Sequence, residues 1–231
     1  MCDPKSKLTC INDGGRIALY VDRLPSGAFE AWTAEAKVRH LVIAAHPSAK
    51  SFNHAVVEAY TSALTERGHR VACRDLYAMR FNPVLSARDM AAVAGGKPAR
   101  DIRAEQNAIR RADVVTLISP LWWSGFPAML KGYLDRVFCA GFAYVIKGQD
   151  YRPGLSGKNG VIITTSGATV EELKSGGTLR ALKTIHDEGF MEFCGITLAG
   201  HLYLSGIDPT MSRTAGERHL DTVRRFVRRA F

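Results

Sequence analysis

The sequence contains no long hydrophobic run. None of its 231 residues belong to an apolar stretch of about 18 residues, the length that would suggest a membrane-spanning helix. The first residues, Met1–Lys7, are mostly polar or charged and are not followed by the apolar core of a secretory signal. These absences predict a cytoplasmic protein without membrane insertion.

Cysteine is scarce and scattered. The chain has 5 cysteines, and it contains neither a Cys-x-x-Cys pair nor a cluster of His and Cys. An odd number of widely spaced cysteines is typical of reduced thiols in a cytoplasmic protein. The same pattern predicts that no metal is bound. The positions are Cys2, Cys10, Cys73, Cys139 and Cys194.

Acidic residues are outnumbered by basic ones, 22 to 31, which gives a formal net charge of +9. Such an excess can reflect nucleic-acid binding, but the chain carries no recognised nucleic-acid motif. It can also attract phosphorylated cofactors. The densest cluster, the arginines within 224–229, alternates with apolar residues at helical spacing. We interpret it as the solvated face of a C-terminal helix.

The remaining pattern alternates apolar strands with amphipathic helices. This alternation predicts an α/β domain with a doubly wound parallel sheet over residues 39–231, preceded by an N-terminal extension of unknown role, residues 1–38. Residues 86–100 are interpreted as a polar connection. The expected strands are 40–45, 69–76, 113–119, 159–166 and 196–205, and the expected helices are 53–67, 101–111, 127–138, 178–193 and 213–230.

The loop after the first expected strand, His46–Asn53, combines hydroxyl and amide side chains with Lys50. It also precedes a helix, whose first N–H groups lack partners within the helix. Together these groups predict an anion site. Simple capping of the helix by Ser51 or Asn53 is the alternative.

The segment Ser119–Arg136 joins the third strand to a helix that begins near Pro127. Between them lie Trp122 and Trp123, flanked by a Ser-Gly pair and two prolines. We expect a rigid loop with free backbone N–H groups beside an aromatic wall, suited to a planar, polar heterocycle. The alternative is that the tryptophans pack in the core or in a dimer.

This segment resembles the P-L-x-W-x-x-x-P-A-x-L-K-G-x-x-x-R-V-F signature of the flavin-dependent NAD(P)H:quinone oxidoreductases, which have a flavodoxin-like fold. Other segments are similar to motifs of the same family, and the resemblance covers roughly 40–205. It implies a five-stranded parallel sheet of order 2-1-3-4-5 with helices on both faces. The further matching segments are H-x-x-x-x-S-F-N at 46–53, D-L-Y-x-x-x-F-N-P at 75–83, F-A-Y at 142–144, T-T-S-G at 164–167 and F-C-G at 193–195.

In the strand order that the resemblance implies, the loops after strands one, three and four converge on one sheet edge, where ligands bind in such folds. Tyr144 matches an aromatic residue that lines the family's pocket for nicotinamide and quinone, and it is the expected catalytic residue; half-exposed packing is the alternative. The expected cofactor-binding residues are His46, Ser51, Phe52, Asn53, Pro120, Leu121, Trp122, Trp123, Ser124, Thr164, Thr165, Ser166 and Gly167.

The resemblance also implies the activity. Hydride would pass from NADPH or NADH to N5 of FAD, with FMN as the alternative cofactor, and two electrons would then pass to a quinone or similar acceptor. Because the donor and the acceptor would use one pocket in turn, the kinetics would be ping-pong. Relatives of this kind act as homodimers with the site at the interface.

The chain departs from the family at several positions. The family's tyrosine and histidine for proton transfer have no match in 169–177, so the proton donor stays open, and water is one candidate. His186 is expected at the surface or facing a dimer partner. A second family tyrosine is Ile146 here, and Asp75 and Tyr77 are interpreted as strand-end packing.

Two other functions fit the same motifs. One is a regulatory flavoprotein that resembles the partners of potassium efflux systems. The other is a pathway-specific reductase of an azo, nitro or biosynthetic quinone compound.

Overall fold

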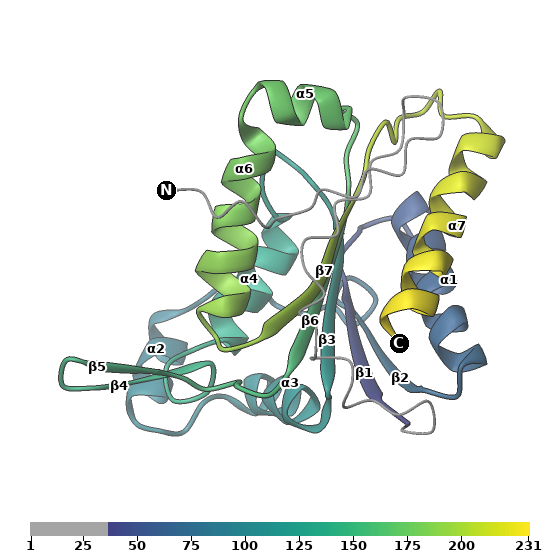
Figure 1. The fold of residues 1–231 in the computed structure, drawn as a ribbon. Coiled ribbons are helices and arrows are strands. Elements are labelled where there is room, and N and C mark those ends of the chain that lie inside the picture. The colour runs from purple at the N-terminus through teal and green to yellow at the C-terminus, as the bar shows by residue number, and fades with distance from the viewer. Residues whose placement is uncertain (1–36) are drawn as a thin grey trace.

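The computed structural model describes residues 37–231, in which five parallel strands form a sheet of order β2-β1-β3-β6-β7 (Figure 1). The predicted order 2-1-3-4-5 is confirmed, because β4 and β5 pair only with each other. The strands are β1 (Arg39–Ala44), β2 (Arg70–Asp75), β3 (Val114–Pro120), β4 (Tyr144–Lys147), β5 (Asp150–Pro153), β6 (Asn159–Thr165) and β7 (Thr197–Leu204).

Helices cover both faces of the sheet. On one face, α1 and α7 contact each other and enclose a core that includes Val56, Phe226 and Val227. On the other face, α3, α4 and η1 enclose the second core, which includes Ile109 and Tyr133. The helices are α1 (Phe52–Glu66), α2 (Ala87–Ala94), α3 (Arg100–Arg111), α4 (Ala128–Val137), α5 (Val170–Ser175), α6 (Thr178–Leu182), the π-helix η1 (Lys183–Glu192) and α7 (Arg213–Ala230).

The central strands read as continuous apolar runs because they are buried on both faces. All seven residues of β3 are buried, and β1 is buried from His40 onward. The closing helix α7 has the predicted bounds, and its Arg228 and Arg229 are exposed as predicted.

Two short helices lie where only connections were predicted. In α2, Ser86 caps the helix, and the Asp89 carboxylate accepts a hydrogen bond from the Ser86 N–H. Thr169 and Glu172 form the same reciprocal capping box at α5. The Ser-x-x-Asp and Thr-x-x-Glu spacings carry this signal, so the interpretation of 86–100 as a plain connection was wrong.

The segment predicted as one helix over 178–193 changes character at Lys183. Here α6 continues into the π-helix η1, a wider helical form that is often found at functional sites. The β4–β5 hairpin was not predicted. Its turn holds Gly148 at a φ of 64°, and the hairpin projects away from the sheet (Figure 1).

The N-terminal extension predicted over residues 1–38 lies outside the described residues except for its last two positions, and Cys2 and Cys10 lie outside them as well. In the part that is described, no helix has both the length and the apolar character needed to cross a membrane. The three cysteines there, at positions 73, 139 and 194, are free.

Candidate functional site

The loops after β1, β3 and β6 meet at the carboxyl edge of the sheet. Strand β3 pairs with β1 on one side and with β6 on the other. The Leu121 N–H donates to the Thr165 carbonyl at 2.7 Å, and the Asn53 amide donates to the Thr165 hydroxyl at 2.9 Å. These bonds hold the three loops together around the crevice that a doubly wound sheet leaves at the carboxyl ends of its strands, and the second bond joins residues 112 positions apart.

The first loop leads into the N-terminus of α1. Ser51 is its N-cap, and the Ser51 Oγ accepts a hydrogen bond from the His54 N–H at 3.3 Å. The first turn of α1 holds no acidic residue that would neutralise the helix dipole. The loop therefore presents free donors and positive potential to an anion.

Phe52 contributes to this loop through its backbone. Its ring is turned toward α7, where it lies 6.0 Å from the ring of His219. The side chain packs against the core between α1 and α7. Phe52 can therefore contribute to an anion site only through its backbone N–H, which lies in the first turn of α1.

The second loop is a tight turn. Trp122 and Gly125 exchange two backbone hydrogen bonds of 3.0 Å each, and the two residues between them, Trp123 and Ser124, have φ values of 52° and 54°. The N–H groups of Trp122 and Gly125 are thus used within the turn, which corrects the prediction that the N–H groups of this loop stay free.

The turn leaves aromatic surface uncovered by the described residues. The Trp123 side chain has a relative exposure of 103%, and that of Trp122 is 43%. The Trp122 ring lies 5.9 Å from the ring of His46 in the first loop. Exposed apolar surface on adjacent aromatic residues is the kind of patch that marks interaction sites.

The third loop, Thr164–Gly167, continues β6. Thr164 and Thr165 are almost fully buried, and the Ser166 Oγ accepts from the Ala168 N–H at 3.1 Å. Gly167 is exposed, and a Cβ placed there would meet nothing closer than 3.8 Å. This loop gives the crevice a floor of hydroxyl groups and an open backbone.

Three buried polar atoms at this edge have no hydrogen-bond partner among the described residues: Asn53 Oδ1, Ser119 Oγ and Thr164 Oγ1. Orphaned polar groups are costly and are commonly satisfied by a ligand or by water. They come from α1, β3 and β6, the elements that carry the three loops. A flat heterocycle with a polar edge, such as a flavin, fits this set.

Tyr144 lies apart from the His46 loop. It lines a second cavity of about 850 Å³ together with Ser124 and Phe126 of the aromatic loop. The Tyr144 ring is half-buried and sits 5.5 Å from the ring of Phe193. This cavity therefore links the expected catalytic residue to the aromatic loop through one shared wall.

His186 lines the same cavity, and its predicted surface position was wrong. The side chain is only 4% exposed because η1 turns it inward, where it stacks on Phe126 with ring centroids 3.8 Å apart. Burial lowers the pKa of His186 to about 4, and repulsion from His201 adds to the effect.

The sequence interpretation missed an interaction between the ends of β2 and α1. His54 Nε2 lies 2.9 Å from Asp75 Oδ2. Asp75 Oδ1 also accepts from the N–H groups of Tyr77 and Ala78. Burial works to raise the pKa of Asp75, but these hydrogen bonds outweigh it and hold that pKa below its usual range. The signal was Asp75 itself, at the end of a strand next to the first loop.

Comparison with known proteins shows the family to which the chain is related. A profile for proteins with a flavodoxin-like fold matches residues 38–227. An uncharacterised NAD(P)H oxidoreductase of Haemophilus influenzae is 40% identical over 160 residues, which cover 69% of this chain and 79% of the relative. NAD(P)H dehydrogenase [quinone] 1 of Rattus norvegicus is 35% identical over 185 residues, covering 68% of this chain and 65% of the relative.

A solved structure agrees. The NAD(P)H:quinone oxidoreductase from Methanothermobacter marburgensis superposes with a TM-score of 0.75 at 34% identity, covering 84% of this chain and 96% of that one. The chain belongs to the flavodoxin-like family of NAD(P)H:quinone oxidoreductases.

Proposed function

We propose that the protein is a flavin-dependent oxidoreductase that uses NAD(P)H to reduce a quinone or similar acceptor by two electrons. The observation that carries the proposal is the meeting of three loops at one sheet edge, where three buried polar atoms have no partner within residues 37–231. The relatives named as quinone oxidoreductases support it. A bound flavin would supply hydride acceptor and donor chemistry that no side chain offers.

Each of the three loops suits a different part of this cofactor. The donors at the start of α1, with Ser51 and the His46 loop, suit its phosphate groups. The turn at Trp122 and Trp123 suits its ring, and the hydroxyl groups of Thr164–Ser166 suit the polar edge of that ring. We assign FAD as the cofactor, with FMN as the alternative that binding titrations decide.

The cavity that Tyr144 lines is our candidate for the pocket of nicotinamide and acceptor. Its wall includes Ser124 of the aromatic loop, so a substrate there would lie next to the cofactor crevice. One pocket for two substrates requires them to bind in turn. Parallel lines in initial-rate plots against NADPH and a quinone are expected, and intersecting lines would contradict the shared pocket.

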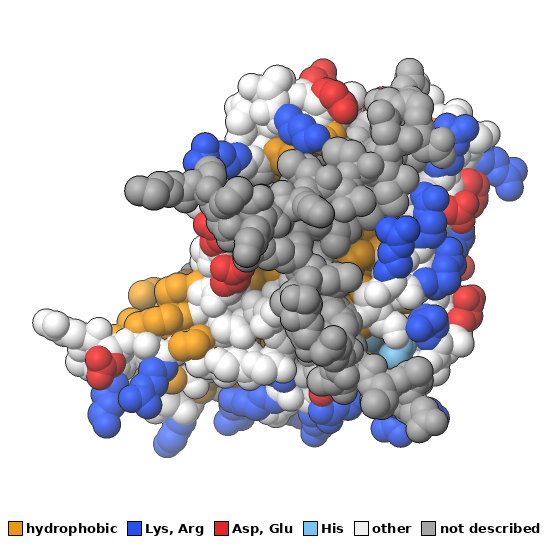
Figure 2. All heavy atoms as spheres, viewed as in Figure 1, with side chains coloured by type: hydrophobic (Ala, Val, Ile, Leu, Met, Phe, Trp, Pro, Cys, Tyr) orange, Lys and Arg blue, Asp and Glu red, His pale blue; other side chains and the backbone are white. Residues whose placement is uncertain are grey.

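A homodimer is part of the proposal. Apolar side chains stay exposed around this cavity on the hairpin and on or next to α2 and η1, and Figure 2 shows hydrophobic surface gathered at the hairpin. Patches of this kind mark interaction sites. A second copy of the chain would cover them and close the pocket. The exposed side chains are Leu85, Met90, Val145, Ile146, Tyr151, Ile185 and Phe193.

The deciding experiment is an absorbance spectrum of the purified protein before and after anaerobic addition of NADPH. Two flavin bands that bleach are expected. Bands that persist would favour a regulatory flavoprotein or another donor. Absence of flavin after reconstitution with FAD and with FMN would overturn the proposal.

The variant Trp123→Ala separates binding from folding. Since this side chain is fully exposed, its removal should change the free energy of unfolding by no more than about 0.5 kcal/mol. Flavin retention after gel filtration should nevertheless fall severalfold, whereas Trp123→Phe, which keeps an aromatic face, should retain most of it. Unchanged flavin occupancy in Trp123→Ala would remove the aromatic turn from the site.

A further inference from the structure

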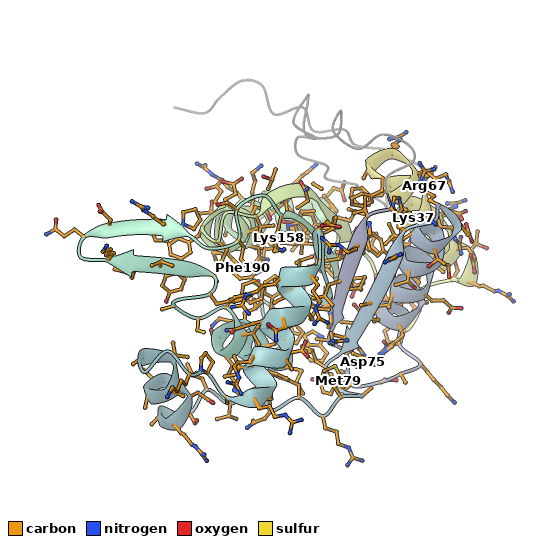
Figure 3. The ribbon with its side chains drawn as sticks, turned by 90° about the horizontal axis from the view of Figure 1, so that it is seen from below. Lys37, Arg67, Asp75, Met79, Lys158 and Phe190 are labelled. Carbon is orange, nitrogen blue, oxygen red and sulfur yellow. The ribbon has the colours of Figure 1, made fainter. Side chains whose placement is uncertain are left out.

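Three side chains form a hydrogen-bonded series at the mouth of the first loop. Ser51 Oγ lies 2.9 Å from His54 Nδ1, and His54 Nε2 lies 2.9 Å from Asp75 Oδ2. Figure 3 shows Asp75 at the end of β2, far from Lys37 and Arg67 at the opposite end of the sheet. The series therefore runs from β2 to the N-cap of α1, at the crevice edge.

The protonation states of the groups determine which atom donates in each hydrogen bond of this series. An ionised carboxylate can only accept, so His54 Nε2 carries a hydrogen and donates it to Asp75. In a neutral imidazole the other nitrogen, Nδ1, is then an acceptor. The Ser51 hydroxyl must donate its single proton to Nδ1, which leaves no hydrogen for a ligand.

Protonation of His54 reverses the bond. In the imidazolium both ring nitrogens are donors, so Nδ1 donates to Ser51 Oγ. The Ser51 hydroxyl proton is then released and can turn toward another acceptor. An ionised phosphate oxygen can only accept hydrogen bonds, and the bonds it accepts are strong because the oxygen is charged. Such an oxygen at Ser51 would therefore favour protonated His54.

We propose that His54 is a positioning residue that couples binding of the flavin phosphates to uptake of one proton, by freeing the Ser51 hydroxyl for a phosphate oxygen. This inference rests on the proposed function, because it needs a phosphate at the start of α1. His54 acts through Ser51.

Helix capping alone does not account for this arrangement. An N-cap serine needs its oxygen to accept from the His54 N–H, and that bond is present at 3.3 Å. The hydrogen bonds from Ser51 to the imidazole and from the imidazole to the Asp75 carboxylate are not needed for capping. Next to the cap, Asn53 is 6% exposed, and its Oδ1 is buried without a partner among the described residues. This second observation points to a missing ligand at the same place.

The charges around His54 allow it to take up a proton. From β2, Asp75 faces it as an ion-pair partner, and hydrogen bonds keep the pKa of Asp75 low. From the loop after β1, the ring of His46 lies 6.4 Å away, and Lys50 is exposed on the same loop. A doubly negative diphosphate would offset the repulsion between Lys50 and a protonated His54.

The experiment is a titration of the apoprotein with FAD from about pH 5.5 to about pH 8.5, the range in which histidine changes charge. FAD is the probe because its diphosphate has no ionisation in this range, whereas the monoester of FMN has one near pH 6. Fluorescence quenching gives the affinity. Calorimetry in buffers of different ionisation enthalpy gives the protons taken up.

The wild-type protein should take up close to one proton per FAD, and its affinity should fall by up to about tenfold per pH unit as the pH rises. Riboflavin, which lacks phosphate, should bind without this uptake. His54→Gln should show neither the uptake nor the pH slope. The control His69→Gln, at the far end of the sheet, should keep both.

Asp75→Asn tests the other end of the series. Loss of the carboxylate should move the fall in FAD affinity to lower pH, because the imidazolium loses its partner. Asparagine still caps the Tyr77 and Ala78 N–H groups, so the turn is preserved. If His54→Gln does not fold, Ser51→Ala gives the same test, since it too should abolish the uptake.

The outcomes separate the two proposals. Failure of wild-type protein to bind either FAD or FMN at any pH would count against the proposed function, whereas failure to bind FAD alone would overturn the role of His54 in holding a diphosphate. FAD binding without proton uptake, equal uptake with riboflavin, or an unchanged slope in His54→Gln would overturn the role of His54 while leaving the flavoprotein intact.

Discussion

At the scale of single residues, the candidate site contains backbone conformations and buried polar groups that lower the stability of the fold. Trp123 and Ser124 occupy left-handed backbone conformations, each of which costs a residue with a Cβ on the order of 1 kcal/mol. At this edge of the sheet, Asn53 Oδ1, Ser119 Oγ and Thr164 Oγ1 are buried without partners among the described residues. A purely structural loop would gain from Asn-Gly at the turn. Strain and unsatisfied groups at one sheet edge are what a binding site requires instead.

A buried histidine at the other end of the sheet makes the stability of the protein sensitive to acid. Burial lowers the pKa of His40 to about 3, with repulsion from His69 adding to it. In the unfolded chain His40 therefore takes up a proton near pH 6.5, whereas in the folded chain it stays neutral at that pH. Stability from this residue is complete above that pH and falls by roughly 1.4 kcal/mol per pH unit below it.

The variant His40→Leu should remove this acid loss. Urea unfolding at pH 7 and at about pH 5 should show a smaller decrease in the variant than in the wild type. Because each protein is compared with itself, a constant packing difference of leucine cancels. Equal decreases in both proteins would show that His40 is not the source of acid sensitivity.

The sequence predicted which three loops meet at the carboxyl edge of the sheet, but not the hydrogen bonds between them. Ser51, Asn53 and the Trp122–Ser124 turn were recognisable because each follows a buried strand in the sequence. The inward turn of His186 was not, because it depends on the wider π-helical geometry of η1. Nor was the bond from His54 to Asp75, which joins two elements whose spacing is fixed only by the folded sheet.

At the scale of elements, two sequence motifs that lie far apart are the two sides of one contact. The F-N-P segment after β2 meets the K-G-x-x-x-R segment of α4. Arg136 donates to the Asn82 carbonyl at 2.9 Å and also pairs with Asp89 of α2. One turn earlier, a Cβ on Gly132 would lie 2.1 Å from the Pro83 carbonyl oxygen. Both motifs were visible in the sequence, but their contact required the fold.

Gly132→Ala should therefore destabilise the protein, although alanine is the better helix former. The added methyl group must push α4 away from the backbone of Pro83, and we expect a loss of roughly 1–3 kcal/mol in the free energy of unfolding. Because α4 starts at the aromatic turn, FAD affinity should fall as well. Urea unfolding and a flavin titration measure the two effects.

The matched control is Gly95→Ala at the end of α2. Gly95 has a φ of −79°, and a Cβ there would make only ordinary contacts, the nearest at 3.5 Å. This variant should be close to wild type in both measurements. A Gly132→Ala protein as stable as the Gly95→Ala protein would mean that α4 can shift freely, and that the two motifs do not fix its position.

At the scale of the whole molecule, the exposed apolar side chains gather on one side. Arginines of α7 are exposed on the face that α1 and α7 cover, and Figure 2 shows Lys and Arg side chains gathered there. The exposed apolar side chains lie instead around the cavity, on the side of the hairpin and η1. Basic side chains also flank the hairpin, at Lys147 and Arg152, so the division is one of apolar surface rather than of charge.

This division allows a direct test of the proposed homodimer. Ile146, on β4 of the hairpin, is 64% exposed. Ile146→Asp should leave the fold and its thermal midpoint unchanged, because an exposed side chain contributes little to folding. It should place a desolvated charge in the interface and shift the protein from dimer to monomer in sedimentation velocity experiments.

The control Arg228→Glu changes charge on α7, across the sheet from the hairpin, and should remain dimeric. If quinone reduction is lost in Ile146→Asp while flavin is still bound, the second subunit completes the acceptor pocket rather than the cofactor crevice. That result would explain why Tyr144 lies apart from the His46 loop within one chain. A wild-type monomer at micromolar concentration, or an unaffected Ile146→Asp dimer, would assign the apolar face to another partner.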